Sequence, residues 1–437
     1  MSVPVSQVER PQPRQPILQT LRAMLAVLTA RVTAFALRRL LRRNASAGPG
    51  IVANLVDPGL VGRALASTPH GLVLVSGSSG KSTTTKMLVD VLRAHGMSVF
   101  TNESTANLRQ GIASSVIAKS TWTGALREDI AVVEIDEAAA TQLGEHLDPR
   151  LLILTNVSSD QLDRFHSVEI ITQHLRRIAD RSKHVVLNAD DANLIGLGAN
   201  RPQSASWFGS TGAARDRFLH RMGYASTTED TTALSEMSPG GTQFVDLSGT
   251  EATFVHHGHT LHLAMPARGA HYAIDAAAAL EAAAVVLPTG VEVALAERAF
   301  RNLDPVFGRG EVVEISGQEV ELVLVQNIAS FQLNLDAFSD APSCVMVAIG
   351  SDVRDTSWLW AVEFSALPHV DVVSGSKAYE LAHRLHFEDV TFDEVDPDLG
   401  QALAHFLDLD VLPGQPKTIV FSADSMRRVR SMLGLAA

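Results

Sequence analysis

A short glycine-rich segment between an apolar run and a helical stretch carries the residues best suited to chemistry. Gly77, Gly80, Lys81 and Ser82 belong to Gly-Ser-Ser-Gly-Lys-Ser-Thr, which follows the apolar residues 72–75. The glycines allow backbone N–H groups to turn toward an anion, the lysine brings a positive charge to phosphates, and the serine hydroxyl can bind Mg²⁺. The segment therefore predicts nucleotide binding, the alternative being a turn that only begins a helix.

A second feature is an apolar run that ends in carboxylates. Glu134, Asp136 and Glu137 follow Val132 and Val133. A buried carboxylate is costly unless a cation or hydrogen bonds compensate its charge, and Mg²⁺ bridges carboxylates to phosphate oxygens. We therefore expect Glu134 to bind Mg²⁺, the alternative being a strand end in contact with water.

Both features need a scaffold that brings their strand ends together. Short apolar, β-rich runs alternate with helical stretches; the predicted strands are 72–75, 131–135, 151–154 and 185–187, and the predicted helices include 84–95 and 170–181. This alternation is typical of an α/β fold with a mostly parallel sheet covered by helices on both faces. Ligands of such sheets bind at the carboxyl ends of the strands, so the glycine-rich segment and Glu134 should meet at one site.

The pattern divides the chain into three parts. We expect a basic amphipathic helical segment at 1–48, a nucleotide-binding domain at 49–305 and a smaller α/β carboxy-terminal domain at 306–437. Residues 201–262 have few long apolar runs and are expected to be an irregular insertion. Four histidines at its end, between 256 and 262, alternate between two strand faces, which argues against one metal cluster.

Composition limits the functional classes. The 437 residues have a net charge of −12, which argues against general nucleic-acid binding because basic residues are not in excess. Cys344 is the single cysteine, which excludes an internal disulfide and a zinc site built from several thiolates. These observations favour a protein of the reducing cytoplasm.

The amino-terminal part departs from the acidic average. It is rich in arginine and has apolar residues at helical spacing, namely Leu21, Met24, Leu28, Val32 and Phe35. Arg22 and Arg31 interrupt this run before the ~20 apolar residues that a membrane span needs. Two interpretations stay open: a helix that makes a peripheral contact with an anionic membrane surface, or a helix docked on the protein's own core.

Together these motifs resemble the Mur ligase family, and more narrowly its MurT members, the ligase-like subunits of lipid II isoglutaminyl synthase. The segment Arg-Asp-Thr-Ser-Trp-Leu-Trp at 354–360 is the most specific, because it resembles the carboxy-terminal domain peculiar to MurT proteins. The other matching stretches are Gly-Ser-Ser-Gly-Lys-Ser-Thr at 77–83, Val-Val-Glu-Ile-Asp-Glu at 132–137, Thr-Asn-Val-x-x-Asp-Gln-Leu-Asp-Arg-Phe at 155–165, Val-Leu-Asn-Ala-Asp-Asp at 186–191 and Phe-Gly-Arg-Gly-Glu at 307–311.

The resemblance implies an ATP-dependent amide ligase of peptidoglycan synthesis. Such proteins activate the α-carboxylate of D-glutamate in the lipid II stem peptide, and ammonia from a GatD-like class I glutaminase then gives D-isoglutamine. The matching positions imply ATP contacts at Gly77, Ser79, Gly80, Lys81, Ser82, Thr83, Asp275 and Arg309, and Mg²⁺ ligands at Ser82 and Glu134. They imply catalytic roles for Lys81, Glu134 and Asp355, the last completing the partner's Cys-His pair.

Three departures from the family pattern keep alternatives open. The four cysteines of the family's zinc ribbon are absent, Asp275 stands where an asparagine contacts the nucleotide, and Gln326 replaces a lysine. One alternative is a diverged Mur-like ligase acting on another carboxylate. Another is a non-catalytic scaffold that binds a glutaminase.

Overall fold

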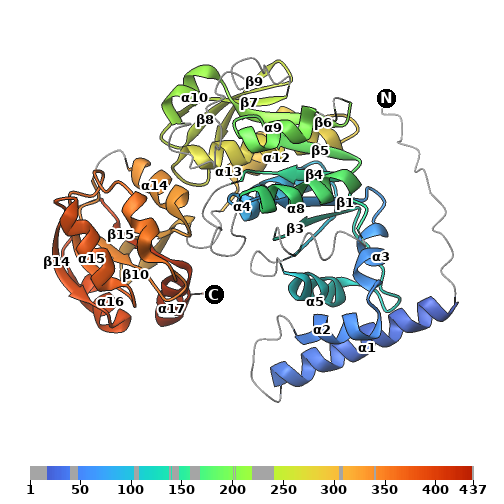
Figure 1. Ribbon diagram of the computed structural model, residues 1–437, viewed down its shortest axis with the longest axis horizontal. Helices are drawn as coiled ribbons and strands as arrows, with labels where there is room; N and C mark the ends of the chain where they lie inside the picture. Colours follow the sequence, from blue (N-terminus) through green and yellow to red (C-terminus); the bar gives the residue numbers. More distant parts are fainter. Residues whose placement is uncertain are drawn as a thin grey trace.

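Two separate β-sheets organise the chain (Figure 1). The structure is a computed structural model that describes residues 17–39, 48–102, 108–136, 139, 147–157, 168–199, 201, 203–218, 241–304, 309–338 and 341–435. The predicted domain boundary at 305 lies outside these residues and stays a prediction.

The first sheet has nine strands in the order β2-β3-β1-β4-β5-β6-β7-β8-β9. The strands from β2 to β7 in this order are parallel, and β8 and β9 complete the sheet as antiparallel strands. Their bounds are β1 (Leu72–Ser76), β2 (Val99–Thr101), β3 (Ile130–Glu134), β4 (Leu151–Leu154), β5 (His184–Asn188), β6 (Ala205–Ser210), β7 (Thr242–Ser248), β8 (Glu251–His256) and β9 (His259–Ala264).

Helices cover both faces of this sheet, as the alternating pattern predicts. Strand β1 shows why: Val73 and Val75 pack in one core, and Leu72 and Leu74 pack in the core on the opposite face. The first face carries α4 (Lys81–Ala94), α10 (Gly212–Phe218), α12 (Ala270–Val286) and α13 (Val293–Arg301). The second carries α3 (Leu60–Ala66), α5 (Arg109–Lys119), α8 (Val168–Arg181) and α9 (Ala192–Ala199).

The expectation of an irregular insertion at 201–262 is wrong for its described part. Strands β6 to β8, helix α10 and the start of β9 lie in this range; β6 and β7 extend the parallel part of the sheet, and β8 and β9 add its antiparallel edge. The apolar runs are short because β7, β8 and β9 bury alternate residues only; in β8, for example, Ala252, Phe254 and His256 are buried and their neighbours are not. A strand with one solvated face has the alternating pattern, which resembles loop composition when Ser, Thr and Gly fill the outer positions.

The second sheet is smaller, with six strands in the order β10-β11-β15-β12-β13-β14. All neighbours are parallel except the β10–β11 pair. The strands are β10 (Arg309–Ile315), β11 (Gln318–Leu324), β12 (Val345–Ala348), β13 (His369–Ser374), β14 (Thr391–Asp396) and β15 (Lys417–Phe421). One face carries α14 (Ile328–Asp336), the 3₁₀ helix η3 (Thr356–Ala361) and α15 (Ala378–Phe387), and the other carries α16 (Leu399–Asp408) and α17 (Ala423–Met432).

The first helix, α1 (Ile17–Arg39), lies on α2 (Gly48–Val56) and α5 at the edge of the molecule (Figure 1). Its docked face consists of the small residues Ala23, Ala26, Val27 and Ala30, all fully buried. The apolar residues whose spacing predicted the helix lie on the opposite face and are exposed. The helix is therefore docked, but not through the residues that the sequence pattern singles out.

By length and composition alone, residues 17–37 would suffice to cross a membrane, which differs from the expectation drawn from Arg22 and Arg31. Buried core helices of soluble proteins and signal sequences meet the same criterion.

Candidate active site

The glycine-rich loop 77–80 lies between the carboxyl end of β1 and the start of α4. Gly77 and Gly80 have φ angles of +129° and +80°, which side chains rarely allow. A Cβ atom at Gly77 would collide with the Thr155 hydroxyl, and one at Gly80 would collide with the Asp275 carboxylate. Both glycines are therefore required by this loop conformation.

We expect Gly80→Ala to lower the free energy of unfolding by about 2–4 kcal/mol, because it combines a left-handed alanine with the collision at Asp275. Gly96→Ala is the matched control: Gly96 has a φ of +84° beyond the other end of α4 and no atom within reach of an added Cβ. That variant should lose only about 1–2 kcal/mol. Urea unfolding of both proteins measures the difference, and equal losses would show that the close approach to Asp275 is relaxed in solution.

Residues after β4 hold the loop in place. Asn156 accepts hydrogen bonds from the Ser78 and Ser79 amides, at 2.9 Å through its backbone carbonyl and 3.0 Å through Oδ1. Thr155 donates from Oγ1 to the Ser79 carbonyl at 2.6 Å. The sequence interpretation did not assign these two residues to the site, although a polar pair directly after an apolar strand is the signal that could have identified them.

Lys81 and Ser82 begin α4 at the loop. The Lys81 ammonium donates to the carbonyl oxygens of Gly77 and Ser78, at 3.0 Å in the second case, so the side chain lies over the loop. Gly80 caps α4 without a side-chain acceptor, which suits the amino end of this helix to an anion. The cradle shape and the donor set therefore fit the phosphates of a nucleotide, with the Ser82 hydroxyl placed at the helix start.

Glu134 lies on the strand next to the loop. Its Cα pairs with that of Val75 in the parallel β3–β1 register, and its side chain is 2% exposed. The Asn102 side chain fixes its backbone, donating to the Glu134 carbonyl at 3.0 Å and accepting from its amide at 2.9 Å. The structure thus places Glu134 and the loop at the same sheet edge, and a hard carboxylate there suits Mg²⁺.

Asp275 approaches the loop from the other side. It lies in the first part of α12, is 6% exposed, and its carboxylate faces the Cα of Gly80. The residue that departs from the family pattern therefore lies directly beside the phosphate loop.

The carboxy-terminal sheet also reaches the loop. Asn327 begins α14 with a capping box, in which its side chain accepts from the Ser330 amide and the Ser330 hydroxyl accepts from the Asn327 amide. The side-chain nitrogen of Asn327, Nδ2, also donates to the Ser79 hydroxyl at 3.0 Å. Arg268 and Glu321 form a further ion pair between the two parts, at 2.9 Å. Asn327 is a site residue to which sequence reasoning gave no role; its signal was the Asn-x-x-Ser cap.

The other predicted site residues are less close. Arg309 begins β10, and its side chain lies outside the described atoms. Asp355 precedes η3, accepts a hydrogen bond from the Ser357 amide at 2.9 Å and is exposed. Hydrogen bonds from Ser357 lower the pKa of Asp355, so it is ionised at neutral pH. In the described part of the chain no hydrogen bond or ion pair joins Asp355 to the loop, and η3 packs on α14 and α15.

Comparison with known proteins agrees with this architecture. Residues 75–283 match the Mur ligase middle domain, and residues 324–420 match the MurT ligase C-terminal domain. A Streptococcus pneumoniae protein named lipid II isoglutaminyl synthase (glutamine-hydrolyzing) subunit MurT is 29% identical, over 84% of this chain and 87% of its own length. The chain thus combines a Mur ligase middle domain with a MurT ligase C-terminal domain.

Further relatives fit this placement. A Staphylococcus aureus (strain COL) MurT subunit is 33% identical over 33% of this chain and 32% of its own. Among solved structures, MurF from Acinetobacter baumannii has a TM-score of 0.65 at 14% identity, covering 88% of this chain and 80% of that one. MurF from Thermotoga maritima in complex with ADP has a TM-score of 0.60 at 17% identity, covering 90% and 84%. At these identities the two MurF structures show the fold alone.

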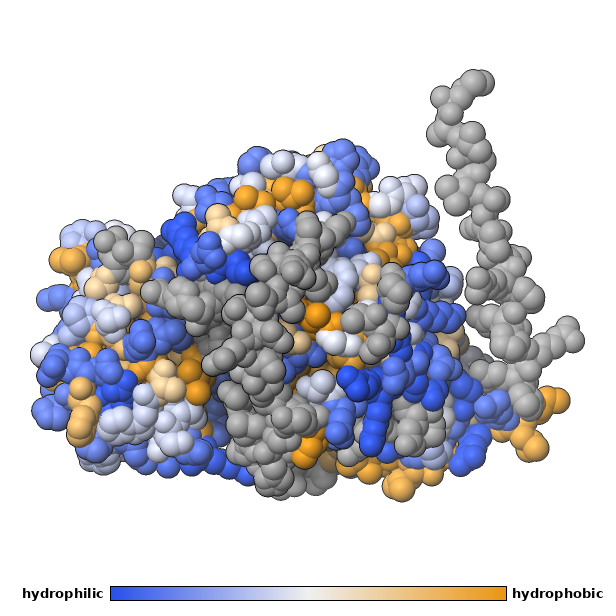
Figure 2. Space-filling model, turned by 45° about the horizontal axis from the view of Figure 1, so that its top comes forward, coloured by the Kyte–Doolittle hydropathy of each residue, from blue (hydrophilic) through white to orange (hydrophobic). Residues whose placement is uncertain are grey.

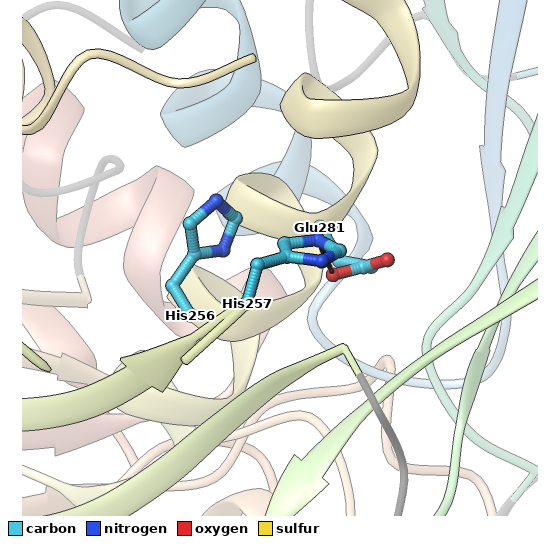
Figure 3. Close-up of side chains that lie close together, drawn as sticks. All are labelled: His256, His257 and Glu281. Atoms are coloured by element: carbon cyan, nitrogen blue, oxygen red, sulfur yellow. Dashed lines mark ion pairs between the residues drawn. The ribbon is translucent and has the colours of Figure 1, made fainter. Parts of the chain in front are cut away.

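A second polar cluster lies where β7 and β8 of the first sheet pack on α12 (Figure 3). His256 ends β8, His257 lies in the following turn, and Glu281 comes from α12; their ligand atoms lie within 4.8 Å of one another. The strand alternation that argued against a metal cluster does not apply to this pair, because His257 has a φ of +47° in the turn. The Thr242 hydroxyl lies 2.9 Å from Glu281 Oε2 and 2.7 Å from His256 Nδ1.

This arrangement is a hydrogen-bonded chain. The Thr242 hydroxyl donates to Glu281, so it accepts from His256 Nδ1, and His257 Nε2 contacts the same Glu281 oxygen at 3.1 Å. These hydrogen bonds tie the β8–β9 hairpin to α12. Burial raises the pKa of Glu281 and lowers that of His256 to about 4.

The buried neutral His256 should make stability depend on pH. Its pKa is about 4 in the folded chain and 6.5 in the unfolded chain, so between these values only the unfolded chain takes up the proton. The free energy of unfolding should therefore fall as pH drops from 6.5 to 4, by about 3 kcal/mol for this group. His256→Asn keeps a donor for Thr242 without a titrating ring, so its unfolding profile should lose this slope. Parallel profiles for parent and variant would contradict the assignment.

Proposed function

We propose that the chain is the ATP-dependent synthetase subunit of a lipid II isoglutaminyl synthase, which amidates the D-glutamate α-carboxylate of the stem peptide. The observation that carries this proposal is the phosphate loop, closed on one side by Glu134 of β3 and on the other by Asn327 of the MurT-type unit. A phosphate site between two units is the arrangement that transfer of a phosphoryl group to a carboxylate needs, because nucleotide and acceptor can approach from different sides.

The chain's own residues supply positioning and charge in this reaction. Lys81, Ser82 and Thr83 hold the phosphates at the start of α4, together with the backbone at Gly77, Ser79 and Gly80. Glu134 and Ser82 would hold Mg²⁺, which would neutralise charge on the transferred phosphoryl group. Asp275 contributes to the nucleotide contacts beside Gly80, and Arg309 contributes from β10. These are the roles that the family motifs assign by position.

Ammonia has to come from a partner. The one cysteine of the chain, Cys344, is fully buried, and burial raises the pKa of its thiol to about 11. Such a thiol is protonated at neutral pH and is not a glutaminase nucleophile. We therefore assign glutamine hydrolysis to a GatD-like class I glutaminase, and propose that exposed, ionised Asp355 orients the histidine of its Cys-His pair.

The location follows from the substrate. Lipid II is held in the membrane, so the enzyme should work in the cytoplasm at the inner face of the plasma membrane, with α1 as its membrane contact.

Reconstitution tests the proposal directly. The purified chain, a GatD-like glutaminase, ATP, Mg²⁺, glutamine and lipid II should give a product with one amide in place of an acid, seen by mass spectrometry. Chain and glutaminase should also copurify. Absence of the amide with a glutaminase that hydrolyses glutamine would overturn the proposal.

Asp275 and Gln326 motivate one alternative, a ligase acting on another carboxylate. ADP release measured across a panel of cell-wall precursors separates the two, because the favoured carboxylate stimulates release.

A further inference from the structure

Helix α1 is docked with its small residues inward and its large apolar residues outward. The docked face, Ala23, Ala26, Val27 and Ala30, packs on Ala53, Leu60 and Ile117. The outward face carries six residues at spacings of three and four, namely Ile17, Leu21, Met24, Leu28, Val32 and Phe35, which are between 40% and 81% exposed. An amphipathic helix that only completes a core buries its large residues, so this orientation calls for a second apolar partner.

The exposed apolar surface is concentrated here. Among the described residues, ten of the twenty exposed large apolar side chains lie on α1 and α2. Figure 2 shows apolar side chains along the lower right edge, where Figure 1 places α1. Single exposed apolar residues are ordinary, but a continuous row along one helix indicates a binding surface.

Charge selects the partner. The described residues 17–39 and 48–56, which make up α1 and α2, contain four arginines and no acidic residue, in a chain whose net charge is −12. A second copy of this acidic chain would meet that charge only in part, and two cationic helices face to face would repel each other. A sheet of acidic headgroups above an apolar interior complements both the arginines and the apolar row.

The contacts of α1 decide how it meets a membrane. Arg22 Nε donates to the Val56 carbonyl at 2.7 Å, and Arg31 Nη2 donates to the Ser120 carbonyl at 2.6 Å. Arg31 also lies over the ring of Trp122, which is 56% exposed beside the helix. These contacts and the buried alanine face hold α1 against the protein along its length, so the helix can lie on a bilayer but not cross it while docked.

We propose that the outward face of α1 binds the surface of an anionic phospholipid membrane, with the apolar row inserted among the acyl chains and the positive charge of this part of the chain attracted to the acidic headgroups. Membrane binding by α1 rests on the proposed function only for its biological purpose. That purpose is to hold the enzyme beside a lipid-linked substrate. The small-residue face makes the membrane contact part of the folded enzyme rather than a flexible tail.

Vesicle cosedimentation of the full chain tests this surface. The chain should pellet with vesicles of equal parts phosphatidylglycerol and phosphatidylcholine, and less with phosphatidylcholine alone or at high salt. The triple variant Leu21→Ser, Leu28→Ser, Phe35→Ser should bind the anionic vesicles about 100-fold more weakly, because three inserted side chains are lost. All three residues are exposed, so its thermal unfolding should match the parent's.

The matched control replaces three equally exposed apolar residues elsewhere: Val312→Ser, Tyr379→Ser and Leu412→Ser should bind like the parent. No binding of the parent, or equal loss in both triple variants, would overturn the proposal. So would a parent dimer that the α1 variant converts to monomer without any vesicle binding. Amidation of a water-soluble stem-peptide substrate distinguishes failure of the membrane proposal from failure of the proposed function. The α1 triple variant should amidate this substrate at the parent's rate. Absence of amidation in the parent would mean that the proposed function is wrong.

Discussion

Replacing Lys81 by alanine should lower ATP-dependent amide formation and ADP release by about 10²–10³-fold, the effect of removing one charged donor from a site of developing charge. The Lys81 ammonium donates to the carbonyls of Gly77 and Ser78, so it both orders the loop and lies where phosphates would bind. Rates of ADP release measured with saturating ATP separate loss of catalysis from loss of binding.

The control for this experiment is Lys183→Ala, which removes an exposed lysine between α8 and β5. It should leave both rates unchanged. If Lys81→Ala also kept the parent's activity while folding normally, the phosphate role would be wrong and the scaffold hypothesis would gain. Thermal unfolding of the Lys81 variant shows whether loss of its two carbonyl contacts destabilises the loop, which we expect to cost about 1–3 kcal/mol.

Asp355→Asn should separate the two sources of ammonia. With glutamine as donor and the glutaminase present, amide formation should fall by about 10³–10⁴-fold, because an asparagine cannot stabilise the partner's imidazolium or fix its tautomer. With ammonium salt as donor the rate should equal the parent's, since no hydrogen bond or ion pair among the described residues joins Asp355 to the phosphate loop. Asparagine Oδ1 can still accept from the Ser357 amide, so η3 keeps its cap.

Asp398→Asn is a matched control for the Asp355 variant. Asp398 caps α16 through the Gly400 and Gln401 amides, is exposed, and has a pKa lowered by those hydrogen bonds. It therefore repeats the chemical change at another helix start. A similar fall with both variants would mean that the effect is structural, and an equal fall with glutamine and ammonium would place Asp355 in the synthetase step instead.

Much of the fold could be predicted because local patterns were strong. Strand β1 alternates between two buried faces and runs into a glycine-lysine-serine loop, so its type, its ends and its neighbour α4 follow from residues close in sequence. The prediction of an irregular insertion at 201–262 was wrong for the opposite reason. Solvated positions interrupt the apolar residues of β7 to β9, and β6 and β7 join the sheet through parallel pairing with β5 and with each other, which the local sequence does not show.

The phosphate loop and the acidic strand were determined by sequence alone, because each depends on a few adjacent residues with demanding backbone or charge requirements. Only the tertiary structure decided which distant groups surround them. Asn156, Asp275 and Asn327 come from three separate elements, and their contacts with the loop depend on how the sheet, α12 and α14 pack. The same holds for α1: periodicity identified the helix, but a helix has two faces, and packing chose the alanines to dock and left Leu21 to Phe35 outside.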